Sequence, residues 1–187
     1  MRRLIGTFVA AAIALGIGIN FNISAAPQTR GAAAQPVSDA IRSAWTSAKK
    51  NIKDTADVVP EANYAYSPVP GTVRTLGQII GHVAGANYVF CSAAKGEKSP
   101  QAEDAFEKLA TKAALVKAWD DSVKYCDAAF AALTDRTAAD QIELPFGQGK
   151  GARTAAFLGN IGHLNEHYGN LVTYMRLKGI VPPSSRR

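Results

Sequence analysis

Apolar residues recur at intervals of three and four along most of the chain, which is the spacing of one face of an α-helix. Ile41 and Trp45 show this spacing in the first such segment, which Pro60 closes. Thr75 followed by Gln78 is a capping box at the start of the second. Four long helices are predicted, at residues 38–59, 75–94, 111–133 and 154–178, and a short helical piece is allowed at 102–109.

The interval before the last helix breaks this pattern. Its sequence, "ELPFGQGKGAR" at residues 143–153, is rich in glycine and predicts a turn or a small hairpin. No internal repeat and no convincing strand is visible elsewhere. The predicted fold class is therefore all-α, a four-helix bundle that occupies residues 38–185.

The N-terminal residues have a different composition. A basic start is followed by an uncharged apolar run at residues 4–19 and by small residues that suit cleavage after about Ala25. We therefore predict a signal peptide at residues 1–25 and a periplasmic or secreted location. Residues 26–37, rich in Ala, Pro and Gln, are predicted to be a flexible lead-in.

An uncleaved membrane anchor is the alternative for this segment. It is less favoured, because Gly6, Gly16 and Gly18 dilute a run that is already short for a bilayer. We expect no stable membrane insertion after cleavage.

The net charge of the chain and its distribution indicate which classes of partner it can bind. The formal net charge of +6 becomes +4 without residues 1–25, because that segment holds two arginines and no acidic residue. The basic residues are dispersed and are not interleaved with aromatic ones. We therefore expect no nucleic-acid binding. A homodimer is compatible with a small bundle, but the sequence does not demonstrate one.

The three histidines are the candidate functional residues of the chain. His163 and His167 lie one helical turn apart in "IGHLNEHYGN", so both rings can reach one ion. The third, His82, lies near the middle of the second predicted helix, and a bundle can bring it to the same level. Three imidazoles with positions left open are typical of a reactive metal site. Zinc, nickel, copper and iron all suit such ligands. A helical scaffold with unrelated histidines stays an alternative.

The stretch "HLNEH" also matches H-x-x-E-H, the motif of inverzincin metallopeptidases, in which the glutamate activates a metal-bound water. Those enzymes take a further glutamate ligand well downstream, whereas no acidic residue follows Glu166 here. The peptidase interpretation is therefore disfavoured. Glu166 stays the candidate catalytic base, although it projects ~60° from His163 and ~100° from His167 around the helix, as a solvated flank residue would.

Three segments carry a family likeness: "RTLGQIIGHVAGANYVFCSAAKGEK", "KAALVKAWDDSVKYCDAAFAAL" and "GHLNEHYGNLVTYMRLKGIVPPSS". Together they resemble the DinB-like superfamily over residues 38–185. The resemblance implies a four-helix bundle with an unusual helix order and a divalent metal on three histidines, which fall here on His82, His163 and His167. It implies no DNA binding.

The resemblance leaves the reaction open. Characterised relatives include thiol transferases that use bacillithiol and a mycothiol-dependent maleylpyruvate isomerase, so it implies that the metal lowers the pKa of a thiol. Those relatives are cytoplasmic, whereas this chain is expected in a compartment where such thiols are scarce. The chain is either an exported metal-dependent hydrolase or thiol/group transferase acting on an unknown small molecule, or a non-catalytic metal- or small-ligand-binding protein.

Cys91 and Cys126 are the two cysteines, and they fall on the second and third predicted helices. An even pair in an exported protein predicts one disulfide, with two buried free thiols as the alternative. The bond would close a loop of about 35 residues and contribute ~3 to 4 kcal/mol. Cys91 follows His82 by nine residues, ~180° around the helix, which makes it a poor fourth metal ligand.

Overall fold

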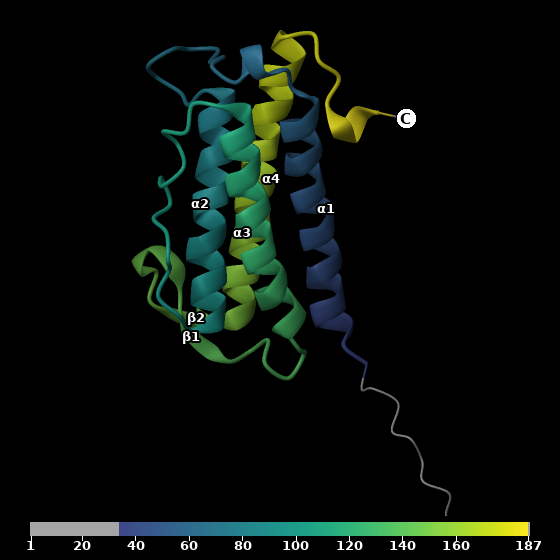
Figure 1. The fold of residues 1–187 in the computed structure, drawn as a ribbon. Coiled ribbons are helices and arrows are strands. Elements are labelled where there is room, and N and C mark those ends of the chain that lie inside the picture. The colour runs from purple at the N-terminus through teal and green to yellow at the C-terminus, as the bar shows by residue number, and fades with distance from the viewer. Residues whose placement is uncertain (1–33, 187) are drawn as a thin grey trace, which may run out of the picture. The chain divides into compact units, whose positions relative to one another are not determined.

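Helices form at the four segments in which apolar residues recur with helical spacing. The computed structural model describes residues 34–186, and its long helices are α1 (Pro36–Val58), α2 (Leu76–Lys95), α3 (Lys112–Ala132) and α4 (Arg153–Leu177). Their buried faces form one core, in which the Trp45 ring stacks on Phe130 with the centroids 4.4 Å apart. The predicted all-α four-helix bundle is confirmed (Figure 1).

The helix ends follow from their capping residues. The Thr75 hydroxyl accepts a hydrogen bond from the Gln78 amide at 3.1 Å, and the Gln78 side chain accepts one from the Thr75 amide at 2.8 Å. This is the predicted capping box of α2. Gly96, with a φ of 74°, ends the same helix. α1 begins at Pro36, slightly earlier than predicted, because proline suits a first turn whose N–H has no helical partner.

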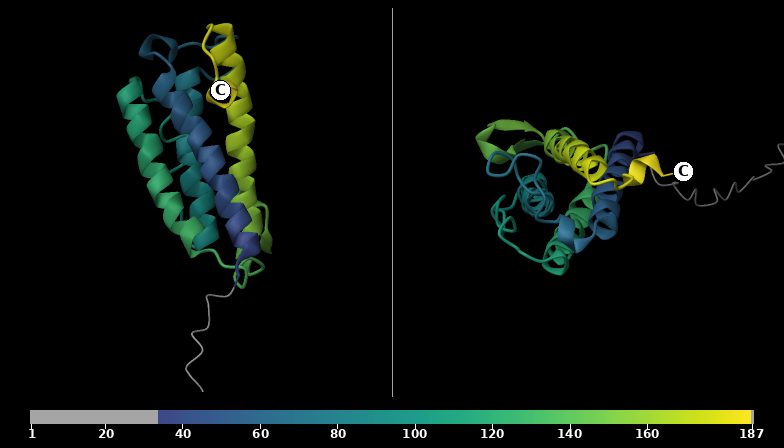
Figure 2. Two further views of the ribbon diagram at one scale, coloured as in Figure 1. Left: turned by 90° about the vertical axis from the view of Figure 1, so that its right-hand side faces the viewer. Right: turned by 90° about the horizontal axis from the view of Figure 1, so that it is seen from above.

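The helices follow the order α1, α3, α2, α4 around the bundle (Figure 2). α1 packs on α3 and α4, and α2 packs on the same two helices. α2 and α3 run in the same direction, since Asn87 donates to Ser122 at 3.0 Å and Cys91 bonds to Cys126 one turn further along both helices. A short turn cannot join parallel neighbours, so the connection at residues 96–111 returns along the bundle beside α2 (Figure 1).

This connection is built of turns. Backbone hydrogen bonds from residue i+3 to residue i close them, for example from the Glu107 amide to the Asp104 carbonyl at 3.1 Å. No regular helix occurs between α2 and α3. The prediction of a short helical piece at residues 102–109 is therefore wrong.

The reason is the close approach of the connection to two glycines of α2. A Cβ atom on Gly81 would lie 2.5 Å from the Phe106 carbonyl oxygen, and one on Gly85 would lie 2.0 Å from the Glu103 carbonyl oxygen. The backbones are thus in direct contact. A helix at residues 102–109 would hold side chains between the two backbones, because this stretch contains no glycine.

The interval before α4 contains a small hairpin, as predicted. β1 (Gln141–Glu143) pairs with β2 (Lys150–Ala152) in antiparallel register, with Ile142 opposite Gly151. Phe146 lies in the loop between them with a φ of 57°, and its ring is 5.2 Å from that of Phe90 on α2. Short 3-10 segments are η1 (Glu61–Asn63), η2 (Pro145–Gly147) and η3 (Pro183–Ser185).

A disulfide joins α2 to α3. It links Cys91 and Cys126, whose Cα atoms are 5.4 Å apart. Both cysteines are buried, and the Asn160 amide of α4 lies 3.6 Å from the Cys91 sulfur. The structure therefore contains the predicted disulfide, and it excludes Cys91 from metal binding.

The N-terminal predictions lie largely beyond this description. The predicted signal peptide at residues 1–25 is outside the described residues, as is most of the predicted lead-in at residues 26–37. Among the helices of residues 34–186, none combines the length and the apolar character that crossing a membrane requires.

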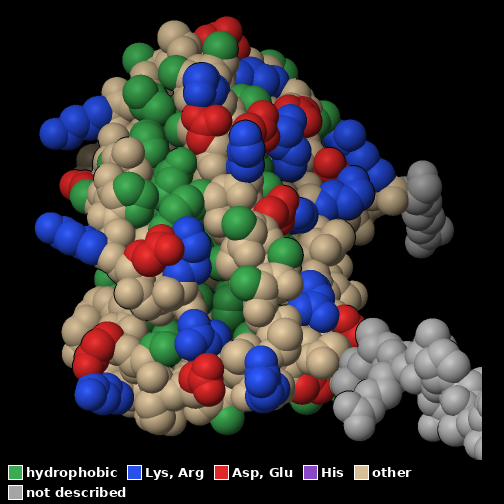
Figure 3. Space-filling view, turned by 60° about the horizontal axis from the view of Figure 1, so that its bottom comes forward, with side chains coloured by type: hydrophobic (Ala, Val, Ile, Leu, Met, Phe, Trp, Pro, Cys, Tyr) green, Lys and Arg blue, Asp and Glu red, His purple; other side chains and the backbone are tan. Residues whose placement is uncertain are grey.

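Charged side chains of both signs are mixed on the surface. On the face seen in Figure 3, acidic and basic side chains alternate and do not separate by sign. Along α1 and α3, Lys53 pairs with Asp57 at 2.6 Å and Lys117 with Asp121 at 2.5 Å. Exposed pairs of this kind contribute little stability. Their pattern agrees with the dispersed charge of the sequence.

Candidate metal centre

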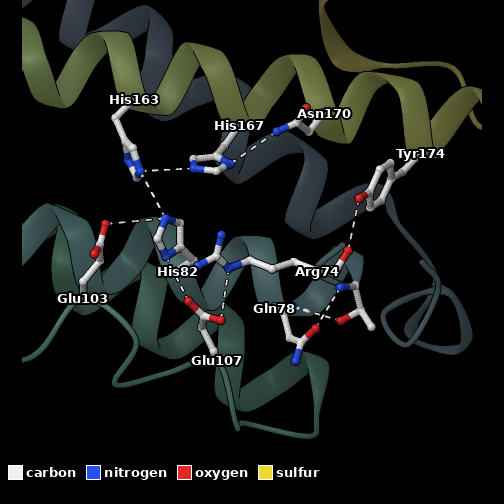
Figure 4. A network of polar contacts seen from close by, with 10 residues as sticks. Arg74, Gln78, His82, Glu103, Glu107, His163, His167, Asn170 and Tyr174 are labelled. Carbon is white, nitrogen blue, oxygen red and sulfur yellow. Dashed lines mark hydrogen bonds and ion pairs between the residues drawn. The ribbon is translucent and has the colours of Figure 1, made fainter. Parts of the chain in front are cut away.

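The antiparallel contact between α2 and α4 gathers the three histidines (Figure 4). His82 comes from the middle of α2, and His163 and His167 come from successive turns of α4. The His163 Nε2 atom lies 3.1 Å from His82 Nε2 and 3.1 Å from His167 Nε2. The structure thus brings together the three residues predicted from the sequence.

The rings meet by their edges. Their centroids are 4.4 to 5.0 Å apart, and the planes are inclined at 57° to 79°. This orientation turns three nitrogen atoms toward one point. Around a tetrahedral ion with metal–nitrogen bonds of ~2.0 to 2.1 Å, ligand nitrogens are about 3.3 Å apart. The two separations from His163 Nε2, 3.1 Å each, are close to this value, and all three ligand nitrogens lie within 4.8 Å of one another. The donor type suits a divalent transition metal held by His82, His163 and His167.

Burial keeps the rings of His163 and His167 in the form that binds a metal. Only 5% of His82 and 8% of His167 is exposed. Burial, followed in order of size by the neighbouring His167, His82 and Arg74, lowers the pKa of His163 to about 3. The pKa of His167 is also lowered, mainly by burial. Neutral imidazole is the metal-binding form, so these two ligands need lose no proton near neutral pH.

A carboxylate orients His82. Glu107 Oε1 lies 2.9 Å from His82 Nδ1, and Glu107 Oε2 accepts from Arg74 Nε at 3.1 Å. A proton on Nδ1 that is donated to Glu107 leaves the Nε2 lone pair facing the other histidines. Carboxylate contacts of this kind are typical of metal-bound histidine.

A second carboxylate approaches the same ring. Glu103 Oε1 lies 3.6 Å from His82 Nε2, the nitrogen that points into the cluster (Figure 4). Glu103 and Glu107 both belong to the connection that contacts Gly81 and Gly85 of α2. That close approach is what brings two acidic side chains to a buried histidine.

The α4 side of the cluster has weaker polar support. Asn170 Nδ2 lies 3.4 Å from His167 Nδ1, and the Tyr174 hydroxyl donates to the Arg74 carbonyl at 3.1 Å. The buried Nδ1 atom of His163 has no hydrogen-bond partner within residues 34–186. One histidine is therefore oriented by a carboxylate, one by an amide and one by packing.

An open pocket of about 580 Å³ lies beside His167. Its lining combines hydroxyl, charged and apolar side chains: Thr72, Val73, Arg74, Ile79, Glu107, Glu166, His167, Asn170 and Tyr174. Glu166 is exposed at this pocket and makes no side-chain hydrogen bond or ion pair within residues 34–186. Its catalytic role stays a prediction.

The sequence reasoning missed the two glutamates and Arg74. Glu103 and Glu107 lie four residues apart in "EDAFE", which was interpreted as part of a short helix and not as a partner of His82. The available signal was Gly81 and Gly85 on either side of His82, because glycine inside a helix marks the close approach of another backbone.

Comparisons with known proteins bear on the family and the fold. The sequence profile of the DinB superfamily matches residues 44–171. No curated protein matches the chain. Similar solved structures include a DinB-like protein from Bacillus cereus, at a TM-score of 0.67 and 19% identity, covering 78% of this chain and 95% of that one.

Two other solved structures are similar at the level of the fold. The mycothiol-dependent maleylpyruvate isomerase has a TM-score of 0.59 and 18% identity, covering 72% of this chain and 60% of its own. A conserved protein from Enterococcus faecalis has a TM-score of 0.60 and 15% identity, covering 75% of this chain and 96% of its own.

Proposed function

This chain belongs to the DinB superfamily, and from that premise and the histidine cluster we propose that it binds one divalent transition metal through His82, His163 and His167. The observation that carries the proposal is the convergence of three Nε2 atoms, with His163 Nε2 3.1 Å from each of the other two. Hydrogen bonds alone explain this arrangement poorly. A ring nitrogen carries either one proton or one lone pair, so His163 Nε2 can hydrogen-bond well to only one of the two neighbouring nitrogens. A cation between the rings would bind the lone pairs of all three nitrogens.

The proposed activity is metal-dependent group transfer or hydrolysis of a small molecule in the pocket beside His167. A bound divalent ion would supply Lewis acidity to a water or thiol ligand. Residues of this chain would supply the other functions. Glu107 orients His82, the apolar core excludes water behind the rings, and Arg74 places a positive charge at the pocket. Similarity to a mycothiol-dependent isomerase supports a thiol as one candidate ligand.

Export is part of the same proposal. The charge-free apolar run at residues 4–19 supports it, and so does the Cys91–Cys126 disulfide, because disulfides persist in oxidising compartments such as the periplasm or the extracellular space. The natural thiol or other substrate is then one found in that compartment.

A non-catalytic metal- or small-ligand-binding role is the second candidate. It is favoured by the position of Glu166, which is exposed and has no polar contact within the described residues that would orient it as a base. Assays of esters, amides and thiol acceptors separate the two candidates, because a binding protein turns over none of them, and a Glu166→Gln variant then tests the role of Glu166. Loss of an assayed turnover with the metal retained supports a catalytic Glu166, whereas unchanged turnover removes Glu166 from the mechanism.

Metal content is the decisive measurement for the site. We expect elemental mass spectrometry of untagged protein to find close to one transition metal per chain, and the His163→Ala variant to lose it, because two remaining imidazoles hold an ion far more weakly than three. Asn165→Ala is the matched control, since Asn165 is exposed on the same turn of α4 and outside the cluster.

Thermal unfolding of each metal-free protein checks that the variants fold. Metal retained in His163→Ala, or no metal in the wild-type chain after zinc or nickel is supplied, contradicts the proposal.

A further inference from the structure

We propose that Glu103 is a fourth, displaceable ligand of the metal, delivered by the connection between α2 and α3. The inference rests on the proposed function, since it concerns the ion that the three histidines would hold. It extends the site from three imidazoles to three imidazoles and one carboxylate.

The first step is the placement of two carboxylates on one ring. Glu107 contacts His82 Nδ1 at 2.9 Å, whereas Glu103 Oε1 lies 3.6 Å from His82 Nε2 (Figure 4). The two glutamates therefore reach different nitrogens. Glu107 is in hydrogen-bond contact, and Glu103 stands at the distance expected between two ligands of one ion, about 3.3 Å or slightly more.

The second step is the charge balance at His82 Nε2. If Glu107 accepts the proton on Nδ1, Nε2 presents a lone pair to His163 and also to Glu103. A carboxylate oxygen and an imidazole lone pair repel each other unless a cation lies between them. A metal ion bound to His82 Nε2 would remove that repulsion between the nitrogen and the Glu103 carboxylate.

The third step is the rigidity of the support. The Glu103 carbonyl oxygen is in contact with Gly85, where a Cβ atom would stand only 2.0 Å away, and the turn that follows is closed by a hydrogen bond from Glu107 to Asp104. The backbone of Glu103 is thus fixed against the helix that carries His82. A ligand on a rigid support needs little ordering when the ion binds.

The exposure of Glu103 defines its role. Its side chain is 38% exposed, whereas that of His82 is 6% exposed. The three histidines form the buried part of the site, and Glu103 closes it on the solvent side. A solvent-exposed carboxylate that ligates through oxygen fills the fourth position of a closed site, and a stronger ligand arriving from the solvent displaces it.

The test is a metal titration of stripped wild-type protein and three variants, with zinc affinity measured by competition with a chromophoric chelator. We expect Glu103→Gln and Glu103→Asp each to weaken zinc binding by about tenfold or more, since glutamine removes the negative charge of the ligand oxygen and aspartate withdraws that oxygen by one methylene group. The shorter aspartate keeps the charge, so a loss in both variants separates ligation from simple electrostatics. Asp104→Asn, an exposed neighbour, is expected to bind zinc as the wild type does.

Cobalt supplies the second readout. We expect azide to change the visible spectrum of the cobalt-loaded Glu103→Gln protein at about a tenfold lower concentration than in wild type, because the carboxylate no longer competes for the same position. Equal zinc affinity and equal azide sensitivity in wild type and Glu103→Gln overturn the role of Glu103. No zinc binding by the wild-type chain overturns the proposed function itself, so the two failures are distinguishable.

Discussion

At the scale of single residues, His163 is the centre of the site. Its Nε2 atom is the one that lies within 3.1 Å of both other histidines, and its Nδ1 atom is buried without a partner in residues 34–186. Protonation of a residue placed in this way is unfavourable, because burial and two neighbouring imidazoles lower its pKa. The metal-free folded protein should therefore be less stable in acid than at neutral pH.

A pH series tests this consequence. The pKa of His163 is about 3 in the folded chain, against an ordinary value of 6.5, so between these values the unfolded chain binds a proton that the folded chain does not. The metal-free protein should lose stability as pH falls from 6.5 toward 3. Urea unfolding of chelator-treated protein at several pH values measures it.

The His163→Gln variant is the comparison, because glutamine has similar polarity and does not titrate. We expect the stability difference between wild type and variant to shift against the wild type at lower pH. A difference that stays constant between pH 7 and pH 4 contradicts the buried, neutral His163.

At the scale of elements, the site depends on how closely the connection at residues 96–111 lies on α2. Gly81 and Gly85 leave room for its backbone, and this contact brings Glu103 and Glu107 to His82. The contact also explains why turns replace the helix expected there. α2 therefore provides one histidine of the cluster directly and positions the carboxylates through its glycines.

The Gly85→Ala substitution tests this role. Its methyl group would stand 2.0 Å from the Glu103 carbonyl oxygen, so the connection must move away. We expect a loss of about 1 to 3 kcal/mol in unfolding free energy and weaker zinc binding. Gly162→Ala is the control: nothing lies within 4 Å of the added carbon, and the gain in helix propensity should raise stability by ~0.5 to 1 kcal/mol. Unchanged zinc affinity in Gly85→Ala would count against the positioning role.

The elements also show what the sequence could predict. Periodic apolar residues and the Thr75–Gln78 capping box predict the four helices, and the H-x-x-x-H spacing with one further histidine predicts the three-histidine cluster. These signals are local or repeat within one helix. The contact of residues 102–107 with α2 is tertiary: it depends on where a non-periodic segment lies, which no spacing encodes. Glu103 and Glu107 were missed for that reason.

At the scale of the whole molecule, the disulfide ties together the two helices that run in parallel. Cys91 and Cys126 are 35 positions apart and join α2 to α3 at a buried level of the core. Parallel neighbours linked by a long connection have no short turn to hold them together. The covalent bond limits how far α2 and α3 can separate in the unfolded chain.

Removal of this bond should therefore destabilise the entire bundle. We expect reduction, or the Cys91→Ala/Cys126→Ala double variant, to lower the unfolding free energy by about 3 to 4 kcal/mol, as loop closure predicts. Urea unfolding with and without reductant measures the change. The double variant should be insensitive to reductant, and thiol titration of denatured, unreduced wild type should find no free cysteine. Two free thiols in that titration contradict the bond.

The separation of the histidines along the chain has a consequence for how the protein matures. His82 and His163 are 81 positions apart, so the cluster exists only after α4 has docked on α2. An unfolded chain offers at most the pair on α4, which is a weak chelator. If the proposed export precedes folding, the chain would leave the cytoplasm without a metal and take up its ion where it folds. The ions supplied by that outer compartment, more than the intrinsic preference of three imidazoles, would then decide which metal the protein carries.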